Sequence, residues 1–284
     1  MTNGSERMAI LGGRGMLGTD LQKAARQHGF TVGVFDLPEF DITNERHLRG
    51  AIADYDVIVN CAAYTNVDGA ESNAETAYAV NAGAAERLGR LAVESDKYVL
   101  HISTDFVFDG RKDGPYDETE LPNPLGVYGR TKLQGEQLLS QTGCRHSIVR
   151  VQWTYGKAGN NFVSKMIQLA RGGKPLKVID DQVGSPTATI EVAAALCDLL
   201  AADRRPEGLF HYAAAGYVNR CEQARFIFDT LKLKVDVSPC RSADYATAAE
   251  RPLNSRFDCD KIQRYLDKPI RPWQEPLAEF LEQL

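Results

Sequence analysis

The sequence predicts an α/β fold built on a doubly wound parallel sheet, with a smaller lobe formed mainly by the second half. Short apolar runs alternate with amphipathic helical patterns through the first half of the chain. These runs are continuously apolar, as in parallel strands that are buried on both faces. A glycine-rich turn lies between the first run and the first helical pattern, and the rhythm weakens after about residue 155.

Hydrophobic periodicity predicts the elements of the first half. The expected strands are 8–11, 31–35, 57–60, 98–102 and 147–151, and the expected helices are 16–27, 74–92 and 126–139. Strands that alternate with helices form right-handed βαβ units. The ligand crevice of such a sheet lies at the carboxyl ends of its strands.

The second half mixes short strands and helices with loops rich in Pro, Asn and Gly. The expected helices are 162–170, 190–200, 219–231 and 273–284, and the expected strands are 176–179 and 209–212. We therefore expect one domain at residues 1–155, which regains some segments from the second half. Residues 156–284 then form mainly a smaller lobe that binds substrate.

Composition excludes several classes of protein. The 284 residues are 43% hydrophobic and 25% charged, with a net charge of -5 and no long basic run, which argues against binding to nucleic acid. No apolar stretch is long enough to span a bilayer, and the N-terminus lacks the apolar core of a signal peptide. The six cysteines are scattered, without the close spacing of a metal site or a disulfide framework. We expect a cytoplasmic protein with no membrane partner and no metal.

The glycine turn predicts a dinucleotide site. Gly12, Gly15 and Gly18 follow the first strand and open a helix, within a segment that also holds Met16 and Leu17. Glycines allow a sharp turn, a close approach of backbone N–H groups to a pyrophosphate, and tight helix–strand packing. The helix N-terminus offers free donors to the phosphates. The domain at 1–155 is therefore expected to be a Rossmann-type dinucleotide-binding domain.

Two residues near this turn favour different cofactors. Asp36 ends the second strand, where a carboxylate accepts hydrogen bonds from the adenosine ribose and favours NAD. Arg14 lies inside the turn, where a guanidinium binds a 2'-phosphate and favours NADP. A solvated surface charge is an equally good interpretation of Arg14. We expect NADPH as the cofactor, with NADH as an alternative.

Tyr128 and Lys132 form a Y-x-x-x-K pattern on an expected helix, one turn apart and on the same face. An adjacent ammonium and an oxidised nicotinamide favour the phenolate, so we expect them to lower the tyrosine pKa. The phenol then exchanges a proton with a carbonyl oxygen as hydride moves at the carbon. On spacing alone the pattern is common and usually marks a solvated helix face.

A hydroxyl pair makes the catalytic interpretation stronger. Ser103 and Thr104 come directly after the strand 98–102, at the edge where such sheets hold their chemistry. A hydroxyl there can align a substrate carbonyl with the tyrosine, although both residues also favour turns.

These motifs resemble those of the extended short-chain dehydrogenase/reductases, and within them the reductases of dTDP-linked 4-keto-6-deoxysugars. The resemblance covers nearly the whole chain. The segments that carry it are 12–18, 41–43, 60–68, 103–110, 128–136, 150–156, 159–162, 181–187 and 251–255. General short-chain dehydrogenases lack the later segments.

The resemblance implies roles for individual residues. Thr104, Tyr128 and Lys132 would be catalytic, with Tyr128 as proton donor and Lys132 also a ribose ligand. The implied cofactor contacts, besides the catalytic pair, are Gly12, Arg14, Gly15, Met16, Leu17, Gly18, Asp36, Asp41, Ile42, Ala62, Ala63, Tyr64 and Thr65. The implied substrate contacts are Thr104, Asp105, Val107, Trp153, Gln182 and Arg251. Core packing, a turn and a solvated charge are the ordinary alternatives for Trp153, Gln182 and Arg251.

The resemblance also implies a reaction: NAD(P)H-dependent reduction of dTDP-4-dehydro-L-rhamnose to dTDP-L-rhamnose. Two alternatives stay open, a sugar-nucleotide epimerase or dehydratase and a non-catalytic NADP-binding regulatory subunit. Some relatives dimerise through a metal held by acidic residues. Asp20 and Glu191 lie near those positions, but Ile190 occupies one of them. A monomer or a homodimer without metal is therefore expected.

Overall fold

A computed structural model describes residues 6–202 and 204–284, and a six-stranded sheet lies at the centre of this part of the chain. Its order is β10-β5-β4-β3-β1-β2, and all neighbouring strands are parallel. The strands are β1 (Arg7–Leu11), β2 (Thr31–Phe35), β3 (Val57–Asn60), β4 (Tyr98–Thr104), β5 (Arg145–Val151) and β10 (Gly208–Tyr212). The predicted doubly wound parallel sheet is confirmed, and its sixth strand comes from the second half of the chain.

The strand order reverses at β1, which has β2 on one side and β3 on the other. Leu11 pairs with Phe35 of β2 and Asn60 of β3, so these three strands end together. β4 and β5 end together in the same way, with Thr104 opposite Val151. The switch point of the sheet therefore opens at the edge where the glycine turn and the 103–105 segment both lie.

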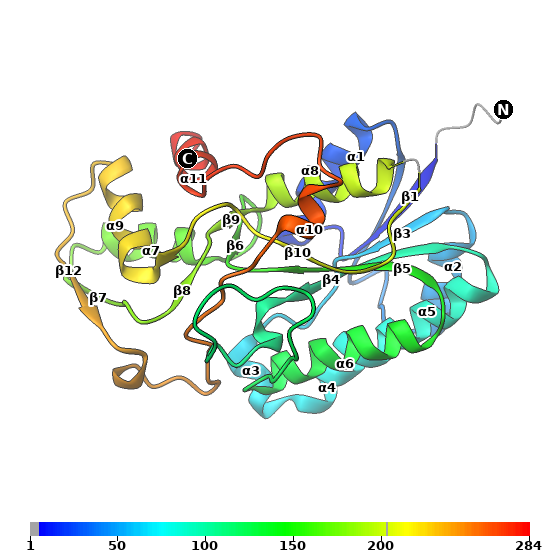
Figure 1. Cartoon of the computed structure of the whole chain (residues 1–284), viewed down its shortest axis with the longest axis horizontal. Coiled ribbons are helices and arrows are strands. Elements are labelled where there is room, and N and C mark those ends of the chain that lie inside the picture. The colour runs from blue at the N-terminus through cyan, green and yellow to red at the C-terminus, as the bar shows by residue number, and fades with distance from the viewer. Residues whose placement is uncertain (1–5, 203) are drawn as a thin grey trace.

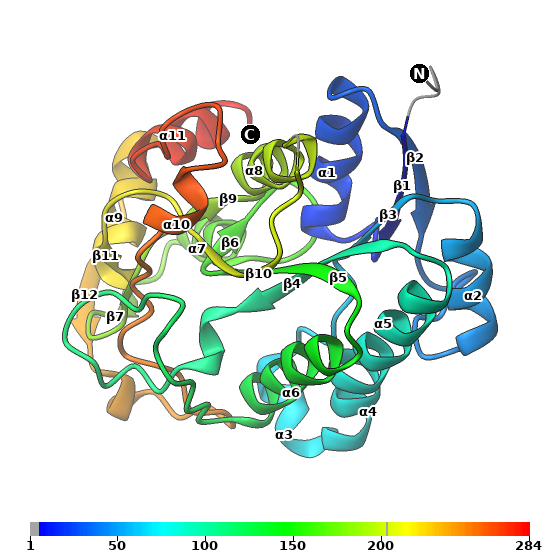
Figure 2. The same ribbon diagram turned by 45° about the vertical axis from the view of Figure 1, so that its right-hand side comes forward.

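Helices cover both faces of the sheet (Figures 1 and 2). One face is covered by α1 (Met16–Gln27) and α8 (Thr189–Ala201). The other is covered by α2 (Glu45–Ala53), α5 (Ala84–Glu94) and α6 (Val127–Gln141). Each face has its own apolar cluster, with Ile10 and Leu196 in one and Leu11 and Leu88 in the other. Ile10 and Leu11 are neighbours on β1 but pack into the clusters on opposite faces of the sheet. Both faces are buried, so the strands are apolar at every position.

The helix expected at 74–92 is interrupted by a π-helical turn. It consists of α4 (Ala74–Tyr78), the π turn (Ala79–Gly83) and α5. The π turn contains the buried Asn81, whose side chain contacts two other segments of the chain. Its amide oxygen accepts from the Tyr64 backbone N–H at 2.8 Å, and its amide nitrogen donates to Thr131 at 3.0 Å. π turns often mark functional sites, and this one ties the loop after β3 to α6.

The second half builds a separate apolar cluster beside the sheet (Figure 1). Its helices are α7 (Phe162–Arg171), α9 (Arg220–Thr230) and α11 (Gln274–Glu282). Three strand pairs accompany them: β6 (Thr154–Tyr155) with β9 (Thr187–Ala188), β8 (Val183–Gly184) with β11 (Val218–Asn219), and β7 (Leu176–Ile179) with β12 (Val237–Cys240). The domain limits at residue 155 stay a prediction.

Several short elements have no counterpart in the expected set. They are α2, α3 (Val67–Ser72), α10 (Asp260–Gln263), β6, β8, β9, β11, β12 and the 3-10 turns Asp105–Val107 and Ser242–Asp244. Most are too short to show a period in the sequence. No helix among the described residues is both long and apolar enough to cross a membrane.

Candidate active site

The glycine turn packs closely against the strand next to it. Gly12 has a φ of 73°, and a Cβ on it would lie 2.6 Å from the Ala62 backbone. Any side chain at this position would therefore push apart the turn and the loop after β3. Gly15 is the N-cap of α1 and makes no side-chain capping bond, so the first N–H groups of the helix are left for another acceptor.

A cavity of about 640 Å³ opens in front of this turn, and we call it the glycine-turn cleft. The residues with predicted cofactor roles that line it are Gly12, Gly15, Met16, Leu17, Asp36, Asp41, Ile42, Ala62, Ala63, Thr65, Tyr128 and Lys132. Its volume lies in the range of small-molecule sites. Most of the predicted cofactor set is thus brought to one cavity.

Three predicted cofactor residues are placed differently. Gly18 is buried within α1, and the Tyr64 backbone is held by Asn81, so neither lines the cleft. The Arg14 guanidinium donates to the Leu37 carbonyl and to Glu39, both at 2.8 Å, and is likewise absent from the cleft wall. Its backbone N–H donates to Asp36 at 2.7 Å. Asp36 and Arg14 are therefore parts of one turn rather than two opposed determinants.

Tyr128 and Lys132 reach the cleft from the first turns of α6. A Cβ on Gly129 would lie 2.2 Å from the Phe106 carbonyl oxygen, so only glycine lets α6 approach the end of β4 this closely. The Tyr128 ring meets the Phe106 ring edge to face, with centroids 5.5 Å apart. Thr104, the last residue of β4, lines the same cavity. The three predicted catalytic side chains are thus brought together.

The pKa of Tyr128 runs against the sequence-based expectation. Burial raises this pKa to about 12, a hydrogen bond with Thr104 opposes the rise, and the Asp105 charge adds to it. Lys132 is not among the groups that shift the pKa of the free phenol, and its Nζ donates to the Ile102 carbonyl at 2.6 Å. The expected lowering by Lys132 is therefore wrong for the protein groups alone. A phenol with a raised pKa is protonated at neutral pH, which is the form a proton donor needs.

Lys132 is shifted in the opposite direction. Burial lowers its pKa to about 8, while the charges of Glu136 and Cys61 oppose the change. Only 2% of Lys132 is exposed. A lysine in this environment exchanges its proton close to neutral pH, unlike a solvated one.

The two hydroxyls after the expected strand 98–102 belong to β4 itself and have different surroundings. Ser103 donates to Glu136, which forms a buried ion pair with Arg150 at 2.6 Å. Thr104 donates to the Asp105 carboxylate at 3.1 Å and faces Tyr128. Both residues line the cleft, but the Ser103 hydroxyl is bound to Glu136, so Thr104 is the hydroxyl that interacts with Tyr128.

A larger cavity of about 1070 Å³ lies against the second half of the chain, and we call it the lobe cavity. It is lined by α7, β7, the 242–248 segment and the 250–253 segment. Phe106, Trp153 and Arg220 line both this cavity and the glycine-turn cleft. The two cavities therefore meet directly beside Tyr128 and Thr104.

The predicted substrate residues are divided among these positions. Trp153 has a φ of 46°, a left-handed conformation that is rare for a tryptophan and is often found at functional sites. Gln182 lines the lobe cavity and donates to the Ser242 hydroxyl at 3.1 Å. Asp105 is buried at the end of β4 and accepts from Thr104 and Ser255; burial raises its pKa to about 6. Val107 is fully buried and lines neither cavity.

Arg251 lies on the lobe cavity but is already paired. Its guanidinium donates to both carboxylate oxygens of Asp68, at 2.7 and 3.2 Å, and to the Ala249 carbonyl. A guanidinium held by a carboxylate in this bidentate way has fewer donors left for a phosphate. The structure therefore makes Arg251 a clamp between α3 and the 249–251 segment.

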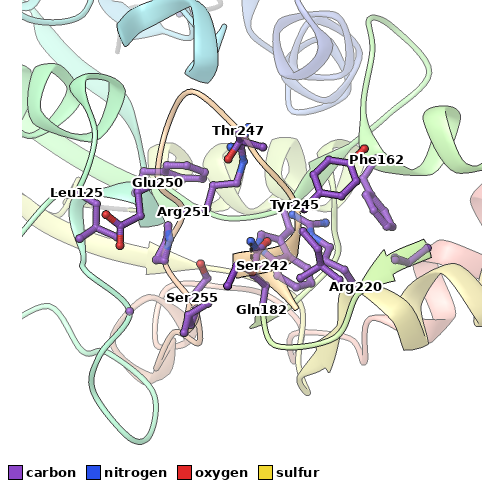
Figure 3. A pocket seen from close by; sticks show the side chains of 18 of the residues that line it. Leu125, Phe162, Gln182, Arg220, Ser242, Tyr245, Thr247, Glu250, Arg251 and Ser255 are labelled. Carbon is purple, nitrogen blue, oxygen red and sulfur yellow. Dashed lines mark hydrogen bonds between the residues drawn. The ribbon is translucent and has the colours of Figure 1, made fainter. Parts of the chain in front are cut away.

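Arg220 is the residue that sequence reasoning missed. Its guanidinium lies 3.4 Å from the centre of the Trp153 ring and 4.7 Å from that of Phe162. Within the described residues it forms no ion pair, and its side-chain hydrogen bond goes to the neutral Gln223. Burial lowers its pKa to about 9. Arg220 and Phe162 lie on one side of the lobe cavity and Arg251 and Leu125 on the other (Figure 3).

A signal for Arg220 was present in the sequence. It is the first residue of α9, directly after the capping residue Asn219. A cation in the first turn opposes the helix dipole, so an arginine there needs another reason.

The described residues contain no group of three His, Cys, Asp or Glu side chains that could hold a metal ion.

The sheet, the glycine turn and the Thr104, Tyr128 and Lys132 group define the class: an NAD(P)-dependent oxidoreductase of the extended short-chain dehydrogenase/reductase type. Within that class, the model of the family described as RmlD substrate binding domain matches residues 6–284, and the chain belongs to this family. The resemblance stated from the sequence is therefore confirmed.

Several known proteins similar to this chain are named dTDP-4-dehydrorhamnose reductase. The dTDP-4-dehydrorhamnose reductase of Aggregatibacter actinomycetemcomitans is 37% identical, over 96% of this chain and 98% of its own length. That of Mycobacterium tuberculosis is 38% identical, over 99% and 94%. A crystal structure of the Bacillus anthracis dTDP-4-dehydrorhamnose reductase in complex with NADP has a TM-score of 0.94 and 32% identity, and covers 99% of this chain and 100% of that one.

Proposed function

We propose that this chain reduces the 4-keto group of dTDP-4-dehydro-L-rhamnose, giving dTDP-L-rhamnose, with NADPH as the reductant and Tyr128 as the proton donor. The single observation that supports it most is the position of Thr104, Tyr128 and Lys132. They lie at the carboxyl edge of the sheet, where the glycine-turn cleft meets the lobe cavity. A cofactor in the first cavity and a sugar nucleotide in the second would meet at this point.

The residues of the glycine-turn cleft fit a dinucleotide. Gly12 leaves a cradle that a Cβ would fill, and the start of α1 presents N–H groups without a side-chain cap. Asp41, Ile42, Ala62, Ala63 and Thr65 all line the cleft. In the proposal Asp41 and Ile42 would contact the adenine, and the other three would contact the pyrophosphate and the nicotinamide ribose. When bound there, the reduced nicotinamide supplies a hydride. The NADP complex of the Bacillus anthracis relative supports NADPH as the cofactor.

The protein groups then handle one proton. Thr104 hydrogen-bonds the substrate carbonyl and aligns it with Tyr128. Tyr128, protonated because burial raises its pKa to about 12, gives its proton to the alkoxide as that oxygen gains charge. The Lys132 ammonium stabilises the phenolate that remains. One carbonyl, one hydride and one proton give one alcohol, so the reaction balances.

We propose Arg220, rather than Arg251, as the ligand for the diphosphate of the substrate. An anionic diphosphate favours a guanidinium with donors left over. Arg220 donates to the neutral Gln223 and only feels the charge of Asp105, whereas Arg251 is bonded to both oxygens of Asp68. Stacking between Trp153 and Phe162 fixes the plane of the guanidinium before substrate arrives. Trp153 and Asp105 then lie beside the sugar, and Gln182 lies farther into the lobe cavity.

The experiment is a spectrophotometric assay of purified protein with dTDP-4-dehydro-L-rhamnose and NADPH. We expect oxidation of one NADPH for each molecule of dTDP-L-rhamnose formed. An epimerase or dehydratase would convert a sugar nucleotide without net consumption of NADPH. A regulatory subunit would bind NADP and co-purify with a larger partner without reducing any 4-ketosugar. Either of these two results would overturn the proposal.

A cytoplasmic location and a monomeric or homodimeric state remain predictions.

A further inference from the structure

A buried histidine lies directly behind Lys132 and is not used in the reaction described above. His101 is on β4, only 1% exposed, and its Nε2 lies 3.5 Å from the Lys132 Nζ. Its Nδ1 lies 3.0 Å from the amide nitrogen of Asn60 on β3. A polar chain of three side chains thus runs from β3 through β4 to α6, beneath the floor of the glycine-turn cleft.

The backbone fixes which end of the Asn60 amide faces the ring. The Ala62 backbone N–H donates to the Asn60 Oδ1 at 3.1 Å, so Nδ2 is the atom that points at His101. An amide nitrogen can only donate a hydrogen bond. The His101 Nδ1 must therefore be bare and accept it.

A neutral imidazole with a bare Nδ1 has its hydrogen on Nε2. Burial, the Lys132 charge and, more weakly, His146 hold the pKa of His101 well below its ordinary value, so the ring is neutral. The Nε2 hydrogen then points at the Lys132 Nζ. If Lys132 is an ammonium, the Nε2–H faces another donor, which is unfavourable. If Lys132 is an amine, the Nε2–H donates a hydrogen bond to the lone pair of Nζ.

We propose that Asn60 and His101 form a positioning pair for Lys132, in which Asn60 holds a hydrogen on Nε2 and that hydrogen favours the unprotonated amine. The proposal rests on the proposed function only for its role in turnover. There, a lysine that loses and regains its proton easily can return one to the Tyr128 phenolate. The lowered pKa of Lys132, about 8, agrees with this arrangement.

The other charged groups around this pair act in known directions. Glu136 on α6 and Cys61 after β3 raise the pKa of Lys132, so they oppose the effect of His101. Arg150 on β5 is bonded to Glu136 and neutralises part of its charge. From β5, His146 acts on His101 only as a weak neighbouring charge. Among these influences burial lowers the pKa of Lys132, and the proposal adds the histidine hydrogen to it.

Nitrogen NMR on the full chain tests the tautomer without any substrate. The protein, labelled with 15N-histidine, has five histidines, and the signal that disappears in His101→Asn identifies His101. We expect a neutral ring with a protonated Nε2 and a bare Nδ1 at neutral pH. Asn60→Asp places an acceptor opposite Nδ1, so the hydrogen should move to Nδ1. A wild-type ring with its hydrogen on Nδ1, or protonated on both nitrogens, would overturn the proposal.

The pH dependence of kcat/KM for ketosugar reduction tests the consequence. Activity should fall as pH rises through the Lys132 pKa. His101→Asn loses the Nε2 donor, so the amine is no longer favoured. The fall of kcat/KM at high pH, the alkaline limb of the profile, should then move up by about one pH unit. His101→Gln keeps an N–H near the Nε2 position and should restore the wild-type limb.

His28→Asn is the matched control, because His28 caps α1 and contacts Asp198 rather than the cleft. Its limb should not move. An unshifted limb in His101→Asn would overturn the role in turnover even if the NMR result holds. If His101→Asn fails to fold, the signal that disappears in His101→Gln identifies His101, and the wild-type spectrum then decides the tautomer. If the wild type reduces no ketosugar, the proposed function fails and the tautomer is still measured.

Discussion

The glycine-turn cleft and the lobe cavity share three lining residues, but different groups line the rest of each. At the turn the cleft is lined by glycine and alanine, and elsewhere by larger side chains that include Asp36, Tyr128 and Lys132. The lobe cavity is lined by long side chains, among them Lys165, Lys177 and Arg220. A cleft of this kind recognises its ligand through N–H groups and shape, whereas the cavity recognises its ligand through side-chain charge. Substitutions should therefore act differently in the two regions.

The largest effect is expected where the two regions meet. Tyr128→Phe removes the hydroxyl that donates the proton and leaves the ring packed on Phe106. We expect kcat to fall by about 10²–10⁴-fold, the usual contribution of a general acid. The affinity for NADPH, measured by fluorescence titration, should change less than about threefold because the cleft keeps its backbone donors. A near wild-type kcat in Tyr128→Phe would show that Tyr128 is not the proton donor.

A buried ion pair between Glu136 on α6 and Arg150 on β5 lies behind the cleft. Glu136→Gln leaves Arg150, 2% exposed, without its carboxylate partner. We expect a loss of about 3–5 kcal/mol in the free energy of unfolding, measured by urea denaturation. Glu86→Gln breaks an exposed pair with Arg90 and serves as control, with an expected loss below about 1 kcal/mol. Equal losses would mean that the buried pair is not structural.

In the lobe cavity the comparison is between two arginines. Arg220→Met keeps much of the apolar volume between Trp153 and Phe162 but removes the free guanidinium. We expect the KM for the dTDP-sugar to rise roughly 10–100-fold, as for loss of a charge-assisted hydrogen bond. Arg251→Met should raise it less, because Arg251 is bonded to Asp68. The reverse order would make Arg251 the diphosphate ligand instead of Arg220.

The difference between the glycine-turn cleft and the lobe cavity also explains which site residues could be predicted from the sequence. The cleft follows from backbone geometry, which glycine spacing and strand ends record directly, so Gly12, Asp36, Thr104 and Tyr128 were found. The lobe cavity assembles from segments far apart in the chain, such as 162–169, 177–182 and 242–253. No local pattern records which of their side chains face each other, and Arg220 was missed for this reason.

The wrong expectations also have a physical cause in tertiary contacts. Spacing placed Lys132 beside Tyr128, but the Ile102 carbonyl on β4 accepts its hydrogen bond, and burial controls both pKa values. Val107 follows the motif that carries Thr104, yet the 3-10 turn after β4 directs it into the apolar cluster with Phe108 and Phe257. A motif identifies neighbours in sequence, while the turn decides which of them reach the cavity.

The smallest effect is expected at Arg14, the one arginine predicted to contact the cofactor. To bind a 2'-phosphate it must leave Glu39, and both groups are exposed. An exposed pair of this kind is worth about 0–1 kcal/mol, so Glu39→Gln should lower the KM for NADPH by no more than about fivefold. The KM for NADH, which has no 2'-phosphate, should stay the same in that variant.

Arg14→Ala completes the test in the opposite direction. It should raise the KM for NADPH by roughly three- to tenfold and again leave NADH unchanged, because Asp36 is held by the backbone N–H at position 14 rather than by the arginine side chain. Steady-state assays with both cofactors measure the ratio. If Arg14→Ala leaves that ratio unchanged, Arg14 is a solvated surface charge, and recognition of the cofactor rests entirely on the backbone of the cleft.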